Sequence, residues 1–269
     1  PLPILEGATF SWQRVGFGNG CARVKGGLFN TATVCWGANP RGMLGTGSSF
    51  GVTNRVELGA LVNPPLNDIS MGNTNACGLS DDHELYCWGN RTSGVVVDGS
   101  ASEDDQLLPV LIPSEHEWRA VDVGNGSACA ITFDNELYCW GSDTQLTWGV
   151  EPTRVDFPAP VVAVRVAQNS ACAATADGNL YCWGNRIARN YEGVANLPGA
   201  RRVLDAPADI SNFAVGLYHA CLTDSEGQAY CFGRDGFGQL GQGEVGEFGT
   251  LTPVRPVTGG HTFMTEPLR

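Results

Sequence analysis

Short apolar runs separated by polar residues return five times along this chain. In the segment ACGLSDDHELYCWG, a polar centre separates two strand-like flanks, which predicts a β-hairpin that turns near Asp82. Successive side chains of a strand point to opposite faces, so Leu79 and Leu85 share one face while Tyr86 and Trp88 share the other. Both faces of the hairpin are apolar, and both must therefore be covered by other parts of the protein. The same pattern occurs in GCARVKGGLFNTATVCWG, ACAITFDNELYCWG, ACAATADGNLYCWG and ACLTDSEGQAYCFG.

Each predicted hairpin carries two cysteines that lie opposite each other. A turn centred on Asp82 pairs Cys77 with Cys87, and directly opposed residues have Cα atoms about 4.5 Å apart, within reach of a disulfide. The first hairpin is longer, but its even spacing keeps its two cysteines on one face. We therefore expect five disulfides that use all ten cysteines: Cys21–Cys35, Cys77–Cys87, Cys129–Cys139, Cys172–Cys182 and Cys221–Cys231.

Zinc ligation and buried reduced thiols are the alternatives to these bridges. Structural zinc sites need clustered ligands such as C-x2-C, which this sequence lacks, and four histidines cannot complete five sites. Five cysteine pairs in one register favour the oxidised form. Because disulfides persist in oxidising compartments, the sequence predicts a secreted or cell-surface protein, with the periplasm as a further candidate.

The recurrence of the hairpin predicts the fold class. The cysteine pair returns about every 50 residues, a period typical of propeller blades. We therefore predict an all-β fold, a β-propeller of about five four-stranded blades in a single domain over residues 1–269. The expected repeats are 21–76, 77–128, 129–171, 172–220 and 221–269, with residues 1–20 completing the last blade.

The two ends of the chain offer an alternative to a closed ring. VRPVTGGHTF at 254–263 resembles PLPILEGATF at 1–10, so both segments occupy the same phase of the repeat. An unpaired terminal strand is a template for another chain, and contacts that do not close produce filaments. A structural subunit that assembles head-to-tail through its terminal strands is therefore the second reading.

Two loops and the hairpin resemble a known repeat family. NPRGMLGTG at 39–47 and RDGFGQLGQGE at 234–244 are similar to the signature loop of the regulator-of-chromosome-condensation repeat family. LYCWGN and TADGNLYCWG are similar to its hairpin, in the cysteine-bearing form seen in extracellular bacterial proteins. The resemblance implies a β-propeller that is used as a binding surface.

Charge and hydropathy exclude two classes of partner. The net charge of −12 repels phosphate backbones, and no basic patch offsets it, so nucleic-acid binding is not expected. No apolar run approaches the roughly 20 residues that a membrane-spanning helix needs. A protein partner or self-association remains the expected interaction.

Motifs for catalysis are sparse in this sequence. Residues 236–241 read G-F-G-Q-L-G, a dinucleotide fingerprint, but no βαβ unit surrounds them, so no cofactor is expected. The chain contains neither G-x-S-x-G nor H-E-x-x-H, and every cysteine has a partner. We therefore predict a non-enzyme with no catalytic residue and no metal site. The acidic run 103–105 is interpreted as a solvated turn, while a carbohydrate-binding or glycoside-active propeller is the third reading.

These features favour a non-catalytic binding module that recognises a protein partner through propeller-face loops. Aromatic residues outside the hairpin pattern are candidate contacts for that partner, with packing between blades as their competing role. They are Trp118, Trp148, Tyr191, Tyr218 and Phe237. Of these, Trp148 and Tyr191 lie in variable polar loops and are the stronger candidates.

Two asparagines lie in glycosylation sequons. Asn90 begins N-R-T and Asn125 begins N-G-S. Both are candidate glycosylation sites in a host that has the machinery.

Overall fold

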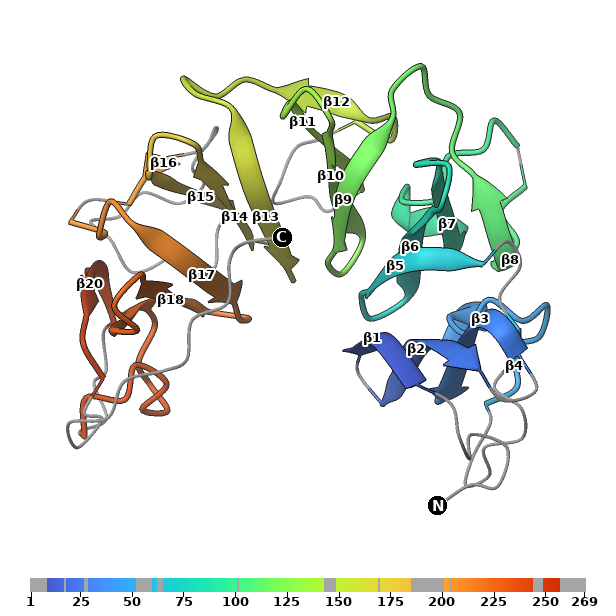
Figure 1. The fold of residues 1–269 in the computed structure, drawn as a ribbon, viewed down its shortest axis with the longest axis horizontal. Helices are drawn as coiled ribbons and strands as arrows, with labels where there is room; N and C mark the ends of the chain where they lie inside the picture. Colours follow the sequence, from blue (N-terminus) through green and yellow to red (C-terminus); the bar gives the residue numbers. More distant parts are fainter. Residues whose placement is uncertain are drawn as a thin grey trace. The chain divides into compact units, whose positions relative to one another are not determined.

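The computed structural model contains five four-stranded β-sheets, which Figure 1 colours in chain order. It describes residues 9–16, 18–26, 29–51, 60–61, 65–100, 102–142, 149–168, 170–184, 201–203, 205–243 and 249–256. In each sheet the four strands follow one another in chain order, and neighbouring strands are hydrogen-bonded. The predicted all-β class and the number of sheets are confirmed.

The sheets share one topology and differ mainly in the length of their fourth strand. The first sheet contains β1 (Thr9–Val15), β2 (Asn19–Gly26), β3 (Phe29–Gly37) and β4 (Ala60–Leu61). The second contains β5 (Leu66–Met71), β6 (Asn75–Ser80), β7 (Leu85–Gly89) and β8 (Gln106–Leu111). The third contains β9 (Trp118–Val123), β10 (Ser127–Thr132), β11 (Leu137–Gly141) and β12 (Thr153–Val155). The fourth contains β13 (Val161–Ala167), β14 (Ser170–Thr175), β15 (Leu180–Gly184) and β16 (Arg201–Arg202). The fifth contains β17 (Ile210–Val215), β18 (His219–Asp224), β19 (Ala229–Gly233) and β20 (Thr250–Val254).

The second and third strands of each sheet form the predicted hairpin. β6 and β7 pair Cys77 with Cys87 and Leu79 with Leu85, which is the register expected for a turn near Asp82. Opposed cysteines are bridged in every sheet, with Cα atoms 4.0–4.1 Å apart. All five predicted disulfides are therefore present, and no cysteine is free.

The hairpins are covered on both faces, as their two apolar faces require. Every residue of β6, β10 and β14 is buried. The chain divides into two compact units, of which the first contains residues 1–133, 138–142 and 148–153. Its core includes the fully buried side chains of Trp88, Trp118 and Trp140. The second unit contains residues 134–137, 143–147 and 154–269, and its core includes Phe213 and Phe232.

The first strand of each sheet corrects the predicted repeat boundaries. β1 pairs with β2, as in Arg14 opposite Cys21, so it belongs to the first sheet. The last sheet takes all four of its strands from residues 210–254. The assignment of residues 1–20 to the last blade is therefore wrong for the strand Thr9–Val15. Boundaries placed at the cysteines cut each sheet between its first and second strands, because a strand that precedes a hairpin pairs with that hairpin.

A glycine ends the third strand of every sheet in a backbone conformation that other residues rarely adopt. These residues are Gly37, Gly89, Gly141, Gly184 and Gly233, with φ between +96° and +122°. At Gly89, a Cβ atom would lie 2.4 Å from the carbonyl oxygen of Thr74 and 2.9 Å from the Cα atom of Asn75. The backbone at Gly89 lies this close to residues 74 and 75 because Asn90 N donates a 2.9 Å hydrogen bond to Thr74 O. The glycine thus fixes the loop after the third strand against the turn between the first two strands.

Replacing Gly89 with alanine is expected to lower the free energy of unfolding by about 1–3 kcal/mol, because the new Cβ meets backbone atoms that cannot move aside. Gly99→Ala is the matched control. Gly99 also has a positive φ, of +78°, but nothing lies within 4 Å of its Cβ position. Urea denaturation measures the free energy of unfolding of both variants. Gly99→Ala reports the cost of the positive φ alone, so a larger loss in Gly89→Ala measures the steric clash. Equal losses in the two variants would contradict the close approach at Gly89.

Candidate interaction surface

The two ends of each sheet carry different kinds of connection. Because neighbouring strands are antiparallel, the turn between the first and second strands lies at the same end as the loop after the third strand. We call this the loop end, and the opposite end, which carries the hairpin turn between the second and third strands, the hairpin end. Both signature-like loops, 39–47 and 235–243, lie at the loop end of their sheets.

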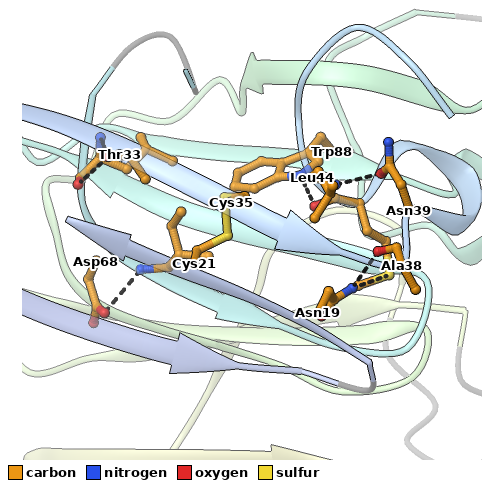
Figure 2. The surroundings of a disulfide bond; sticks show 12 residues. Asn19, Cys21, Thr33, Cys35, Ala38, Asn39, Leu44, Asp68 and Trp88 are labelled. Carbon is orange, nitrogen blue, oxygen red and sulfur yellow. Dashed lines mark hydrogen bonds between the residues drawn. A yellow bond between two sulfur atoms is a disulfide. The ribbon is translucent and has the colours of Figure 1, made fainter. Parts of the chain in front are cut away.

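The loop after β3 is held in shape by one buried asparagine. Asn39 is 3% exposed, and its Oδ1 accepts a 2.8 Å hydrogen bond from Leu44 N. Its Nδ2 donates to the carbonyl oxygen of Ser48 at 2.6 Å and to that of Phe50 at 3.1 Å. Leu44 is fully buried beside the ring of Trp88 (Figure 2). The loop is therefore pinned from inside, which limits the entropy it loses on binding a partner.

The loop after β19 repeats this geometry with an aspartate in place of the asparagine. Asp235 is 5% exposed, and its Oδ1 accepts a 2.9 Å hydrogen bond from Leu240 N. Leu240 is 2% exposed, like its counterpart Leu44. The residue two positions after the acceptor is exposed in both loops: the Arg41 side chain is 49% exposed and Phe237 is 84% exposed. Both loops thus present a variable tip residue on a fixed backbone.

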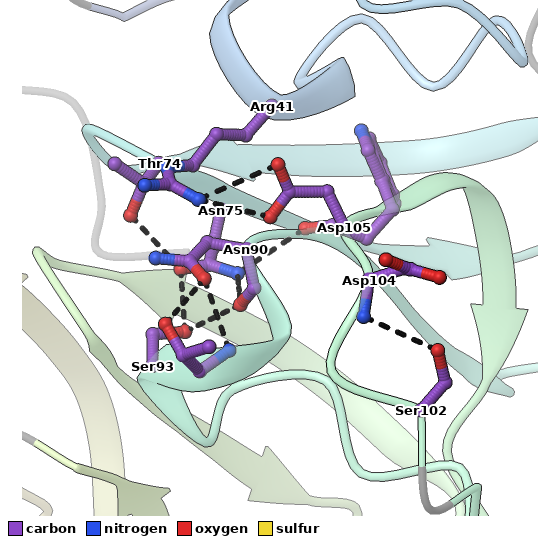
Figure 3. Close-up of polar contacts among 10 residues, drawn as sticks. Arg41, Thr74, Asn75, Asn90, Ser93, Ser102, Asp104 and Asp105 are labelled. Atoms are coloured by element: carbon purple, nitrogen blue, oxygen red, sulfur yellow. Dashed lines mark hydrogen bonds and ion pairs between the residues drawn. The ribbon is translucent and has the colours of Figure 1, made fainter.

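The loop after β7 is held by a different polar network (Figure 3). Asn75 is fully buried and donates from Nδ2 to the carbonyl oxygen of Asn90 at 2.7 Å. Its Oδ1 accepts hydrogen bonds from the hydroxyls of Ser93 at 2.7 Å and Thr74 at 3.2 Å. This network positions the short 3-10 turn η3 (Arg91–Ser93), in which Ser93 is buried.

A buried ion pair closes the same loop. Arg91 donates to both carboxylate oxygens of Asp98, at 2.6 and 2.8 Å, and to Gln106 Oε1 at 2.7 Å. The two charged side chains are only 9% and 11% exposed. These hydrogen bonds hold the pKa of Asp98 at about 2, below its usual value, although burial acts in the opposite direction.

Acidification from about pH 4 to pH 2 is expected to remove the contribution of the Arg91–Asp98 pair to the free energy of unfolding. The unfolded carboxylate takes up its proton near pH 4 and the folded one near pH 2, so the stabilisation is present above this window and is lost as pH falls through it. Its size is about 2 kcal/mol. Denaturation midpoints measured across this range should depend less on pH in Asp98→Asn than in the wild type. An Asp98→Asn variant with the wild-type pH profile would contradict the assignment, and Asp105→Asn, which removes the exposed pair with Arg41, is the control.

The loops after β3 and β7 each accept a hydrogen bond from the tryptophan of the following sheet. Trp88 Nε1 donates a 2.7 Å hydrogen bond to the carbonyl oxygen of Met43. Trp140 Nε1 donates a 2.9 Å hydrogen bond to the carbonyl oxygen of Val95. The sequence showed the recurrent tryptophan after the second cysteine, but the loop carbonyl that it binds could not be read from spacing. The tryptophans therefore link the conformation of a loop to the packing of the next sheet.

The structure separates the five predicted aromatic contacts. Trp118 is 1% exposed and packs edge-on against Tyr138 with ring centroids 5.5 Å apart, so its prediction as an exposed contact is wrong. Trp118 begins the first strand of its sheet and lies in a buried cluster with Leu79 and Leu85 of the β6–β7 hairpin, which the sequence position alone did not reveal. Trp148 and Tyr191 lie outside the described residues. Tyr218 and Phe237 both lie at the loop end of the fifth sheet.

Both sequon asparagines lie at the loop end. Asn90 begins the loop after β7, and its Oδ1 accepts hydrogen bonds from the backbone N and the hydroxyl of Thr92 at 2.9 and 2.8 Å. Asn125 lies in the turn between β9 and β10 and is partly exposed. Glycan attachment at either residue stays a prediction.

Within the described ranges, none of the helices has the length and apolar character that a bilayer crossing requires.

Comparison with known sequences identifies the repeat. The model of the regulator of chromosome condensation (RCC1) repeat matches residues 67–94, 118–145 and 210–239. Among curated proteins, the chain is similar to the mitochondrial RCC1 domain-containing protein RUG3 of Arabidopsis thaliana, with 28% identity over 117 residues. This match covers 43% of the chain but only 26% of RUG3, so the chain spans about a quarter of that relative's length.

Solved structures with the same arrangement of strands extend the likeness to nearly the whole chain. Human WBSCR16 superposes with a TM-score of 0.77 at 16% identity, covering 96% of this chain and 69% of that one. Prp20p of Saccharomyces cerevisiae, described with its binding to Gsp1p and histones, gives a TM-score of 0.74 at 18% identity, covering 96% and 66%. At these identities the likeness establishes the fold alone. Three segments of the chain are therefore similar to the regulator of chromosome condensation (RCC1) repeat, and its sheets have the fold of four-stranded β-propeller blades.

Proposed function

We propose that this chain is a secreted or cell-surface binding module without catalytic activity, which recognises a protein partner through the loop end of its blades. One observation carries the proposal: two loops of different sequence share an internal hydrogen bond, which a leucine amide donates to the side chain five residues before it. The two loops present different exposed tip residues, Arg41 and Phe237. A frame that repeats within the chain and carries a different exposed residue in each copy is the arrangement expected of a recognition surface.

The bridged hairpins support both parts of this proposal. Five disulfides in one chain are typical of proteins that work in an oxidising compartment. They also fix the strands from which the loops leave, so the loops can bind with little loss of conformational freedom. The family likeness agrees with binding, since Prp20p is described with its binding to Gsp1p and histones.

Photo-crosslinking from the two ends of one sheet tests the proposal. A benzophenone amino acid is placed at Phe237 of the loop end and, as the matched control, at exposed Glu226 in the β18–β19 hairpin turn. The purified variants are incubated with the native cell-surface and secreted fraction and irradiated. We expect a discrete protein adduct from position 237 and none from position 226. Adducts only from position 226, or from neither position, would contradict binding at the loop end.

Self-association through a terminal strand is the second candidate. β1 is exposed along most of its length, and Phe10 and Val15 are 52% and 83% exposed. An exposed strand of this kind can pair with another chain. Light scattering over a range of concentrations tests it, and a strictly monomeric particle would remove this candidate.

A further inference from the structure

Four side chains lie on two neighbouring segments at the loop end of the fifth sheet. Leu217 and Tyr218 form the turn between β17 and β18, while Arg234 and Phe237 follow β19. Arg234 N donates a 2.8 Å hydrogen bond to the carbonyl oxygen of Tyr218, which holds the two segments side by side. The guanidinium carbon of Arg234 lies 5.3 Å from the centroid of the Tyr218 ring. We call these four residues the Arg234 patch.

The Arg234 patch is both exposed and rigid. Phe237 is 84% exposed and Leu217 is 38% exposed, and Arg234 is also exposed. The loop below Phe237 is fixed by the hydrogen bond from Leu240 N to Asp235, and Phe237 N donates to Gln239 Oε1 at 2.8 Å. Tyrosine and arginine are among the side chains that contribute most to binding energy at protein interfaces, and phenylalanine is enriched there.

The arginine of this patch differs from the arginines of the other described loops. Arg41 is paired with Asp105 at 3.1 Å, and Arg91 is paired with Asp98 at 2.6 Å. Arg234 forms no ion pair with any residue in the described ranges, and Asp235 beside it turns its Oδ1 inward to Leu240 N. The chain has a net charge of −12, so an exposed arginine stacked on an aromatic ring is a positive charge on a mostly acidic protein.

From this arrangement we infer the chemistry of the partner: the Arg234 patch binds a protein segment in which a carboxylate stands next to an apolar side chain. Tyr218 positions the guanidinium, which can donate two hydrogen bonds to the oxygens of one carboxylate. Phe237 and Leu217 lie exposed on the same two segments and supply apolar area at the same end of the sheet. This inference rests on the proposed function and adds the type of segment that the fifth sheet recognises.

Selection from a random peptide library tests the inference. A phage-displayed library of peptides about 12 residues long is panned on the wild-type protein, and the enriched peptides are synthesised and titrated against variants. Arg234→Glu reverses the charge of the patch. Arg255→Glu is the matched control, because Arg255 is also exposed and also lies 5.3 Å over a tyrosine ring, that of Tyr230. Phe237→Ser reports on the loop end independently of charge.

We expect the enriched peptides to carry Asp or Glu next to Leu, Ile or Phe. Arg234→Glu should weaken their binding by tenfold or more, and Arg255→Glu should leave it within twofold. Peptides without acidic enrichment that still lose binding in Phe237→Ser would overturn the inference while leaving the proposed function in place. Peptides whose binding neither Arg234→Glu nor Phe237→Ser changes would overturn both.

Discussion

Replacing Trp88 with alanine is expected to lower the free energy of unfolding by about 3–5 kcal/mol. The side chain is fully buried in a cluster with the Cys21–Cys35 disulfide, Leu44 and Leu66. Alanine would leave a cavity there and would also leave the carbonyl oxygen of Met43 without the 2.7 Å hydrogen bond from the indole. Chemical denaturation of the variant measures the loss directly.

Two further variants divide this loss into its causes. Trp88→Phe keeps most of the apolar volume and removes the indole donor, so a loss of about 1–3 kcal/mol is expected. Trp36→Ala is the matched control, because Trp36 follows the second cysteine of the first hairpin but is only partly buried. A loss in Trp88→Ala that is no larger than in Trp36→Ala would contradict the cross-sheet link.

Removing one disulfide is expected to cost about 2–3 kcal/mol, because the unfolded chain gains the freedom that a short ring denies it. The Cys77→Ala, Cys87→Ala double variant is suited to this test. Both positions are fully buried, and their sequence separation of 10 makes the ring closed by the disulfide short. Urea denaturation of the variant and of the wild type gives the difference.

The same comparison under reducing conditions provides the control. Full reduction should remove the difference between the wild type and the double variant, because the wild type then has no bridge at this position either. Equal stability of the two proteins without reductant would show that this hairpin is not held by its disulfide.

The sequence predicted the hairpins well because their constraints are local. A turn near Asp82 and the alternation of side chains suffice to place Cys77 opposite Cys87, and the structure has this register. Apolar residues on both faces of the strand required both faces to be covered, and every residue of β6 is buried.

Pairing between a hairpin and the strand before it was harder to predict from the sequence. The strand Thr9–Val15 occupies the same position in its repeat as every strand that precedes a hairpin. That position does not say whether the strand pairs with the hairpin that follows it or with the last sheet of the chain. The hydrogen bonds to β2 decide this. Trp118 shows a related limit: its place outside the hairpin motif left exposure and packing as alternatives, while the structure buries it in a cluster with the β6–β7 hairpin and Tyr138.

The sequence predicted that loops form the candidate interaction surface but did not show which end of the sheets carries it. Loops of variable length after the third strand were expected to carry specificity, and Phe237 lies exposed in one of them. The stacking of Arg234 on Tyr218 joins two segments that are separated by a whole hairpin. No sequence pattern marks that pair, because the backbone crossing at Gly233 brings them together.

Each blade contains a hairpin closed by its own disulfide, which fixes the strands from which the loops at one end leave. Proteolysis of the native protein without reduction, followed by mass spectrometry, tests this claim most directly. We expect five linked peptide pairs, each joining the two cysteines of one hairpin, and no cysteine that reacts with an alkylating agent. Ten alkylated cysteines, or bridges between different hairpins, would contradict it.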